Sequence, residues 1–278
     1  DVTPHFTSEP LSTVQKLGGP VTLLCTAEPP WAHISWLFNG ELLERISSQG
    51  VDIQSGHLTI PSLGTAHIGQ YQCIASTSVG AILSRPATVS VACSPQVDSH
   101  ILHPVIAQTV LVQIHDPLTL ECVVGGVPNH SQVYWYKGGK EAEAYGRRKL
   151  LHTHLVIEQV QRSDAGNYSC VFDNGSGVFQ RVNYTLTVLE PPSISQKNED
   201  QSLIMGSNVR FSCESRGNPS PNITWFHNAV QIHPSAHHQI SGNKLRITNL
   251  IAEDSGIYQC FANNGVGSAQ VSQRLTVK

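Results

Sequence analysis

The sequence lacks the features that mark membrane spans and nucleic-acid binding. No apolar run reaches about 18 residues, the length needed to cross a bilayer as a helix. The chain opens on DVTPHF, without a charged and then apolar leader. We therefore expect a processed piece without a membrane span. The formal net charge is only −3, which argues against nucleic acid as a partner, because domains that bind nucleic acid concentrate positive charge.

Catalytic and cofactor-binding motifs are missing as well. The chain has no G-x-S-x-G elbow, no H-E-x-x-H motif, no phosphate-binding loop and no dinucleotide fingerprint. Two G-x-G stretches, 175–177 and 265–267, fit the tips of hairpins. We predict no catalytic residue, no cofactor and a protein that is not an enzyme.

The histidines, 14 in all, raise the question of a metal site or a pH-sensitive element. His152 and His154 would share one face of a strand, and a second group holds His233, His237 and His238. Neither group has an acid or a cysteine at matching spacing nearby, so we predict no metal site. We expect no pH-sensing role for the second group either, although it would be the natural pH-responsive element.

A motif of eight residues occurs three times: SDAGNYSC at 163–170, EDSGIYQC at 253–260 and a degraded copy, AHIGQYQC, at 66–73. Each copy ends on the second of two cysteines, and a tryptophan follows the first. The sets are Cys25, Trp36 and Cys73; Cys122, Trp135 and Cys170; and Cys213, Trp225 and Cys260. This order is typical of immunoglobulin domains. We predict an all-β chain of three tandem immunoglobulin-like (I-set or C2-like) β-sandwiches, at residues 1–92, 93–190 and 191–278.

The spacing of the motif has a physical reason. A disulfide between facing sheets needs two strands whose inward positions meet, and an indole fills the space beside it. The tyrosine two residues before the second cysteine also points inward, and it can bond to backbone near the preceding turn. Asp164 and Asp254 are expected to serve that turn. His67 replaces the acid in the first copy and should bond across the turn less well.

The cysteines predict an extracellular location. The six in the motifs are expected to form the disulfides Cys25–Cys73, Cys122–Cys170 and Cys213–Cys260, which persist in an oxidising compartment. Cys93 is left over, and we expect a free or trapped thiol there, with an intermolecular disulfide as the alternative. Five N-glycosylation sequons fit the same location: Asn129, Asn167, Asn174, Asn183 and Asn222.

Two sequence features indicate which surfaces are open to partner proteins. The compact basic run Arg147–Lys149 is expected to be a solvated hairpin, not a heparin or phospholipid site. Four of the five sequons lie in 93–190, so that domain would be the most covered by sugar. We therefore expect protein contacts at hairpins of the other two domains, Thr77–Gly80 and Asn263–Gly267.

Whole phrases of the chain resemble the Cdo/Boc family of immunoglobulin-superfamily cell-surface receptors. HFTSEPLSTVQKLGGPVTLLC with ISWLFNGELL is similar to the first immunoglobulin domain of that family. PLTLECVVGGVP with QVYWYK is similar to the third, and GNPSPNITWFHNAVQIHPSAHH with GIYQCFANNGVGS to the fourth. A second domain, expected between Ala92 and Ser99, is missing.

The resemblance implies a single-pass membrane receptor with roles in cell adhesion, myogenic differentiation and Hedgehog reception as a co-receptor. Its partners would be cell-surface or secreted proteins, such as cadherin-type or Hedgehog-receptor components, and its membrane anchor would lie outside this segment. In that family a membrane-proximal fibronectin type III domain holds Hedgehog, so no ligand-binding residue is carried over to this chain. The alternatives are a structural spacer array and a secreted decoy without a ligand site of its own.

Overall fold

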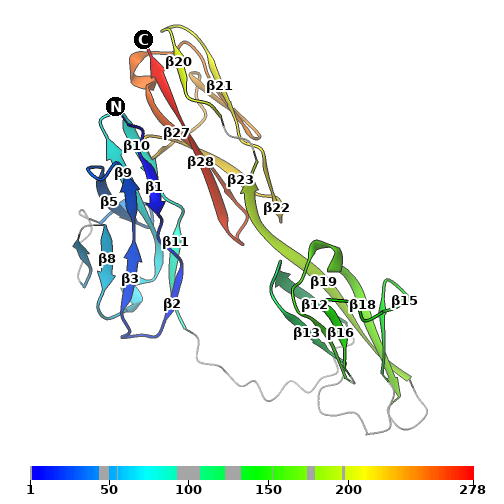
Figure 1. The fold of residues 1–278 in the computed structure, drawn as a ribbon. Helices are drawn as coiled ribbons and strands as arrows, with labels where there is room; N and C mark the ends of the chain where they lie inside the picture. The colour runs from blue at the N-terminus through cyan, green and yellow to red at the C-terminus, as the bar shows by residue number, and fades with distance from the viewer. Residues whose placement is uncertain are drawn as a thin grey trace. The chain divides into compact units, whose positions relative to one another are not determined.

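Strands make up nearly all of the regular structure in the described part of the chain (Figure 1). The computed structural model describes residues 2–43, 50–54, 56–92, 107–122, 133–151, 153–173, 179–195 and 198–278. The helices in this part are three single 3-10 turns: η1 (Thr65–His67), η2 (Arg162–Asp164) and η3 (Ala252–Asp254). None of the described helices has the length and apolar character of a membrane span. The chain divides into two compact units, Asp1–Gln96 with Pro191–Lys278 and Val97–Glu190.

The first sandwich consists of β1 to β11. One sheet has the order β2 (Thr13–Gln15), β11 (Ala87–Val91), β9 (Gly69–Thr77), β5 (His33–Phe38) and β6 (Glu41–Leu42), with β10 (Gly80–Leu83) also paired to β9. The facing sheet has the order β3 (Val21–Leu24), β8 (His57–Ile60) and β7 (Asp52–Gln54). β1 (His5–Ser8) pairs with β4 (Thr26–Glu28).

The middle sandwich repeats this plan. Its larger sheet has the order β12 (Ala107–Gln113), β19 (Phe179–Ile194), β18 (Gly166–Asp173), β14 (Val133–Lys137) and β15 (Lys140–Glu141). The facing sheet has the order β13 (Leu118–Glu121), β17 (His154–Ile157) and β16 (Arg148–Leu150). β19 passes unbroken through the predicted junction at Glu190 and Pro191, because two adjacent prolines favour extended backbone. The predicted domain boundaries stay predictions.

The third sandwich has the same two layers. One sheet has the order β20 (Gln201–Leu203), β28 (Ser268–Val277), β27 (Gly256–Asn263), β23 (Asn222–His227) and β24 (Val230–Gln231). The other has the order β21 (Val209–Ser212), β26 (Lys244–Ile247) and β25 (His238–Ser241). β22 (Ser215–Asn218) pairs with β19.

Each sandwich has its own core around a disulfide and an indole. The bonds are Cys25–Cys73, Cys122–Cys170 and Cys213–Cys260, and all six cysteines are buried. Trp36, Trp135 and Trp225 are at most 4 % exposed. Alternate residues of β3, β8, β21 and β26 are buried, as the period of two in their sequences predicts. The two cysteines of each pair meet across the core.

A tyrosine hydroxyl ties each core to the turn before it. The hydroxyl donates to the carbonyl four residues upstream, over 2.7 Å from Tyr71 to His67, 2.6 Å from Tyr168 to Asp164 and 2.7 Å from Tyr258 to Asp254. This is the backbone bond predicted from the motif. Burial raises the pKa of Tyr71 and of Tyr168 to about 12, so these hydroxyls remain donors at every physiological pH.

Candidate interaction site

The first and third sandwiches belong to one unit and meet through β10 and β27. Ala75, Ile82 and Ile257 form a buried apolar cluster between them, each at most 2 % exposed. Partly buried side chains pack against this cluster: Phe6, Ala27, Ala32 and Ile34. The two sandwiches thus share a hydrophobic contact that is separate from their own cores.

The pattern of burial along β27 shows how the contact arises. Tyr258, Cys260 and Ala262 face the core of the third sandwich, and the alternate positions Ile257, Gln259 and Phe261 are buried as well, at most 5 % exposed. A strand of an isolated two-layer sandwich buries only one face. The second buried face of β27 therefore needs a second partner, and the first sandwich supplies it.

Gln259 joins the two sandwiches by pairing with the backbone of β10. Its Oε1 accepts from the N–H of Leu83 at 2.7 Å, and its Nε2 donates to the carbonyl of Leu83 at 2.8 Å. Nε2 also donates to Oε1 of Gln270 at 3.0 Å. One amide side chain thus makes the two hydrogen bonds that a neighbouring strand would make. It satisfies the buried N–H and carbonyl of Leu83, which would cost free energy if they were left without partners.

Asn228 makes the second polar connection. Its Oδ1 accepts from the N–H of Ala81 at 3.1 Å and from the N–H of Ile257 at 3.0 Å, so a single oxygen bonds both strands. A Cβ at Gly80 would lie 2.4 Å from this oxygen, and one at Gly256 would lie 2.6 Å from the same side chain. The close approach therefore requires glycine at both positions.

This contact changes the interpretation of the hairpin Thr77–Gly80, which the sequence suggested as a surface for partner proteins. The strand that follows the tip, β10, is already covered by the third sandwich. The hairpin Asn263–Gly267 is ordered by its own asparagines: Asn263 Oδ1 accepts from the N–H of Gly265 at 2.8 Å, and Asn264 Oδ1 from the N–H of Val266 at 3.0 Å. Whether that hairpin binds a partner stays a prediction.

A different surface of the first sandwich exposes a large aromatic side chain. Trp31 lies between β4 and β5 and is 75 % exposed, whereas the three motif tryptophans are buried. It lines a cavity of about 590 Å³ together with Pro30, Ile53 and residues of β4 and β5. Exposed tryptophan at the rim of a hollow is characteristic of contact surfaces between proteins.

The three 3-10 turns place different side chains at one equivalent position. Asp164 Oδ2 accepts from the N–H of Gln161 at 2.7 Å, and Asp254 Oδ2 accepts from the N–H of Ile251 at 2.9 Å. In the first sandwich, Nδ1 of His67 accepts from the N–H of Gly64 at 2.8 Å. The histidine therefore makes the bond across the turn that we expected it to make less well.

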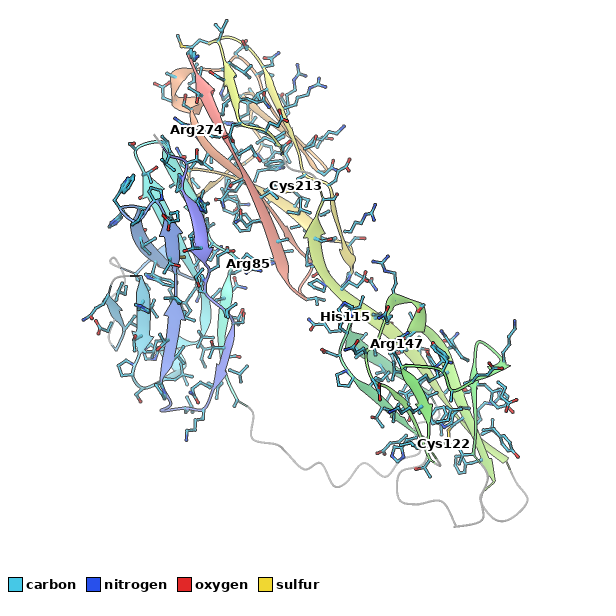
Figure 2. The ribbon with its side chains drawn as sticks, in the orientation of Figure 1. Arg85, His115, Cys122, Arg147, Cys213 and Arg274 are labelled. Atoms are coloured by element: carbon cyan, nitrogen blue, oxygen red, sulfur yellow. A yellow bond between two sulfur atoms is a disulfide. The ribbon has the colours of Figure 1, made fainter. Side chains whose placement is uncertain are left out.

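The acid of the middle sandwich has an arginine partner. Arg147 Nη1 donates to Asp164 Oδ2 at 2.7 Å, and the carboxylate is 1 % exposed. Burial acts to raise the pKa of Asp164, but the hydrogen bonds from Arg147, Gln161 and Tyr145 and the charge of Arg147 outweigh it, so the pKa lies below its ordinary value. Arg148 is only 6 % exposed and lies over the ring of Tyr145. The prediction of a solvated basic hairpin is therefore wrong for Arg148, whereas Arg147, labelled in Figure 2, is partly exposed in its ion pair with Asp164.

We expect Asp164→Asn to destabilise the middle sandwich by roughly 2 kcal/mol at neutral pH, because it replaces charge-assisted hydrogen bonds with neutral ones. Since the folded-state pKa of Asp164 is lowered, its contribution is complete above the unfolded pKa of about 4 and disappears as pH falls through the folded value. Hydrogen exchange of β17 and β18 peptides against pH measures both effects.

The control for this variant is Glu158→Gln, because Glu158 pairs with Lys149 in an exposed ion pair, 50 % and 59 % exposed. Exposed pairs contribute at most about 1 kcal/mol, so exchange should hardly change. Equal effects of the two variants would contradict the role given to Asp164.

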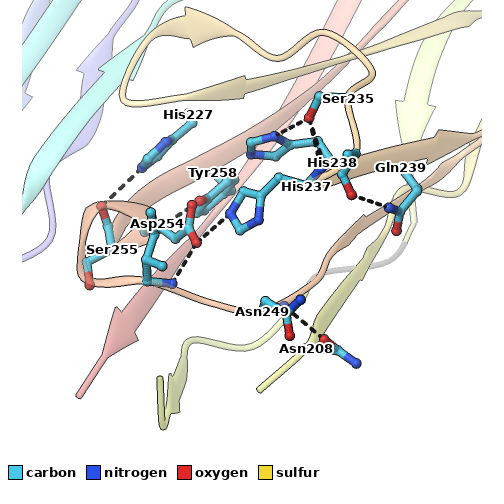
Figure 3. Close-up of polar contacts among 12 residues, drawn as sticks. Asn208, His227, Ser235, His237, His238, Gln239, Asn249, Asp254, Ser255 and Tyr258 are labelled. Carbon is cyan, nitrogen blue, oxygen red and sulfur yellow. Dashed lines mark hydrogen bonds and ion pairs between the residues drawn. The ribbon is translucent and has the colours of Figure 1, made fainter. Parts of the chain in front are cut away.

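The acid of the third sandwich has a histidine partner (Figure 3). His237 Nε2 and Asp254 Oδ2 lie 2.7 Å apart. His238 stands edge-on to His237, with ring centroids 4.8 Å apart, and burial, followed by the charge of His237, lowers the pKa of His238. His227 stacks on Tyr258 at 4.4 Å and bonds the carbonyl of Ser255. The sequence search missed Asp254 as a neighbour because 17 residues separate it from His237.

The structure places the remaining predicted residues as follows. Cys93, Asn129, His152 and Asn174 lie outside the described residues. The other sequons are exposed on strands: Asn167 on β18, Asn183 on β19 and Asn222 on β23. His154 lies near Glu121, with Nε2 and Oε1 3.3 Å apart. Glycosylation at the three exposed asparagines stays a prediction.

Comparison with known proteins identifies the sandwiches. Residues 3–77 and 103–174 match the immunoglobulin domain family, and residues 192–277 match the immunoglobulin I-set domain. The predicted fold of tandem immunoglobulin sandwiches is therefore confirmed. The N-terminal four immunoglobulin domains of Dscam1 isoform 6.9 superpose with a TM-score of 0.79 at 20 % identity, covering 99 % of each chain. The insect immune protein hemolin gives a TM-score of 0.68 at 18 % identity, covering 99 % of this chain and 100 % of that one. At such identities the likeness shows the fold alone.

Two relatives with higher identity share a name. The Xenopus laevis protein "Cell adhesion molecule-related/down-regulated by oncogenes" is 62 % identical over 374 residues, covering all of this chain and 30 % of the relative. The Mus musculus protein of that name is 38 % identical over 375 residues, with the same coverage. Human "Brother of CDO" is 29 % identical, covering 98 % of this chain and 33 % of the relative. The chain spans about a third of the length of these relatives.

Proposed function

The chain belongs to the Cdo/Boc family of immunoglobulin-superfamily proteins, and from this membership we propose that it is an extracellular segment of a cell-surface receptor that acts in cell adhesion. The observation that carries the proposal is the 62 % identity, over the whole chain, to a relative named as cell adhesion molecule-related. Three buried disulfides support an oxidising, extracellular location. The role is one of binding without catalysis.

We further propose that the parent receptor is a single-pass membrane protein and a Hedgehog co-receptor that promotes differentiation, including myogenesis. Its partners are cell-surface or secreted proteins, with cadherin-type and Hedgehog-receptor components as the candidates. Family membership supports this step. Within that receptor the segment contributes protein contacts, and Hedgehog itself is bound elsewhere.

We also infer that this chain omits one immunoglobulin domain that its relatives carry. The alignment with the Xenopus laevis relative runs over 374 residues, whereas the chain has 278. The difference of 96 is about the length of one immunoglobulin domain, roughly 100 residues. This supports the sequence-based interpretation that the second domain is missing after Ala92.

The surface around Trp31 is the place at which we propose that a partner protein binds. β10 is already covered within the molecule, whereas Trp31 is 75 % exposed beside a cavity. Tryptophan in such a place contributes large contact area at low entropic cost. The proposal therefore moves the expected contact from the hairpin Thr77–Gly80 to the connection between β4 and β5.

Cells that display the full receptor carrying this segment are expected to aggregate, and Trp31→Ala should weaken their adhesion by roughly 2 kcal/mol, about thirtyfold, the scale of a hot-spot residue. Because Trp31 is exposed, folding should be unaffected. Leu11→Ala is the matched control, since Leu11 is 70 % exposed on the same sandwich. Adhesion can be measured as the rate of cell aggregation under shear.

Two further experiments distinguish a binding role of the segment from a spacer role. Replacement of the segment by unrelated immunoglobulin domains of equal length should abolish adhesion if the segment binds, and preserve it if the segment is a spacer. If adhesion survives both this replacement and Trp31→Ala, the binding proposal fails. Retention of Hedgehog signalling in the same cells would show that the two activities belong to different parts of the receptor.

A further inference from the structure

The third sandwich brings together two adjacent histidines and a nearly buried carboxylate: His237, His238 and Asp254. One ligand atom from each side chain lies within 4.8 Å of the other two. No second group of three such residues occurs in the described ranges. Imidazole nitrogens and a carboxylate oxygen are the donors that Zn²⁺ takes in proteins.

Hydrogen bonds hold both sides of this cluster in place (Figure 3). Ser235 Oγ accepts from the N–H of His237 at 3.2 Å and from the N–H of His238 at 3.0 Å. Nδ1 of His238 lies 3.2 Å from the same hydroxyl oxygen, a bond of the kind that fixes the orientation of a ligand ring. On the other side, the N–H of Ile251 bonds the carboxylate of Asp254 at 2.9 Å.

The middle sandwich has two basic side chains at the positions equivalent to the two histidines. Arg147 and Arg148 precede Asp164 by the same 17 and 16 residues by which His237 and His238 precede Asp254. One cation is enough for the carboxylate: Arg147 bonds Asp164, while Arg148 packs over the ring of Tyr145. A guanidinium remains protonated and cannot coordinate a metal, whereas neutral imidazole is a ligand. The third sandwich therefore keeps the pairing of a basic side chain with the carboxylate, and its basic side chains can also coordinate a metal ion.

We propose that His237, His238 and Asp254 form a Zn²⁺ site, with two imidazole nitrogens, one carboxylate oxygen and water as ligands. Tetrahedral zinc with bonds of about 2.0 Å places its ligand atoms about 3.3 Å apart. The observed 2.7 Å from His237 Nε2 to Asp254 Oδ2 and the upper limit of 4.8 Å bracket this value, so side-chain rotations must bring the farthest ligand atoms closer by up to about 1.5 Å. The side chain of His237 is 30 % exposed, which gives the ion access.

The proton balance of binding follows from the hydrogen bond that zinc replaces. When His237 Nε2 donates to Asp254, this nitrogen carries a proton. If His237 is an imidazolium, binding breaks that N–H bond, forms an N–Zn bond and releases one proton to water; if it is a neutral imidazole, the proton moves from Nε2 to Nδ1 and none is released. The affinity for zinc therefore falls as pH falls into the range in which His237 is an imidazolium, and there the binding heat depends on the ionisation enthalpy of the buffer.

The test uses the whole chain without a histidine tag, titrated with zinc chloride in a calorimeter. One strong equivalent is expected, with a rise in the melting temperature. His237→Arg with His238→Arg copies the arginine pair of the middle sandwich, so it keeps a cation beside Asp254 but removes the ligands. This double variant should weaken zinc binding by at least about 100-fold. That loss is larger than the one expected when a residue that only orients a ligand is removed.

Two companion variants make the result specific. His238→Gln leaves the pair of His237 and Asp254 intact and should also weaken binding, which covers the case that the double variant does not fold. His57→Arg, at an exposed position on β8, should bind zinc as the unmodified chain does. Cobalt titration gives an independent readout, because a tetrahedral Co²⁺ site absorbs strongly in the visible range. Absence of a strong equivalent in the unmodified chain, or its persistence in both His238 variants, would overturn the proposal.

Discussion

Replacement of Cys122 and Cys170 together by alanine is expected to unfold the middle sandwich at 37 °C. The bond closes a loop between residues separated by 48 positions, and the chain-entropy model gives such a loop a stabilisation of about 4 kcal/mol. A domain of this size is stable by only about 5–15 kcal/mol, and both cysteines lie in the core. The double substitution therefore removes a large fraction of the folding free energy.

The effect should be confined to one unit. Residues Val97–Glu190 form a compact unit separate from the other two sandwiches, so hydrogen exchange should become fast in β14, β17 and β18 and stay slow in β9 and β27. Ala142→Ser, a small change at the edge of the same core, serves as a control for handling and expression. Protected amides in β18 of the double variant at 37 °C would show that the disulfide matters less than we infer.

Ile257→Asp is expected to separate the first sandwich from the third. Ile257 is 0 % exposed and belongs to the apolar cluster between them. A carboxylate there would have to lose its hydration without a cationic partner in the cluster, which costs several kcal/mol. Since Ile257 faces away from the core of the third sandwich, that core should survive.

The readout for this variant is the amide of Leu83, whose partner is the Gln259 side chain at 2.7 Å. On separation, its hydrogen exchange should accelerate to that of an exposed strand edge, while amides of β28 stay protected. Val230→Asp provides the matched control, because Val230 is 68 % exposed on β24 of the same sandwich. If Leu83 stays protected in Ile257→Asp, the contact does not depend on the apolar cluster.

The residues of the three cores could be predicted from the sequence because short-range patterns determine which side chains point inward. The positions of Trp36, Trp135 and Trp225 follow from a period of two and from the spacing to cysteine, so no knowledge of distant segments was needed. The contact of β10 with β27 required such knowledge, because it joins residues 176 apart, Leu83 and Gln259. A signal was nevertheless present. Ile257 occupies the outward position at which the other two copies of the motif have Gln70 and Asn167.

The histidine cluster was missed for a similar reason. A search by short spacing finds ligands on one strand or helix, but Asp254 reaches His237 from a turn in a different part of the sandwich. Alignment of the motif copies would have suggested the contact between His237 and Asp254, since Arg147 and Asp164 have the same separation in sequence. Internal repeats thus predict contacts at positions where local patterns do not.

β10 lies at an edge of its sheet, and the way in which this edge is covered affects the solubility of a receptor displayed at high density. An unpaired strand edge is a template on which strands of other molecules can add, and this is a common route to aggregation. Here the amide groups of Gln259 and Asn228 occupy the edge, and a side chain cannot extend a ladder as a strand does. Variants that open this contact should therefore self-associate as well as move more freely.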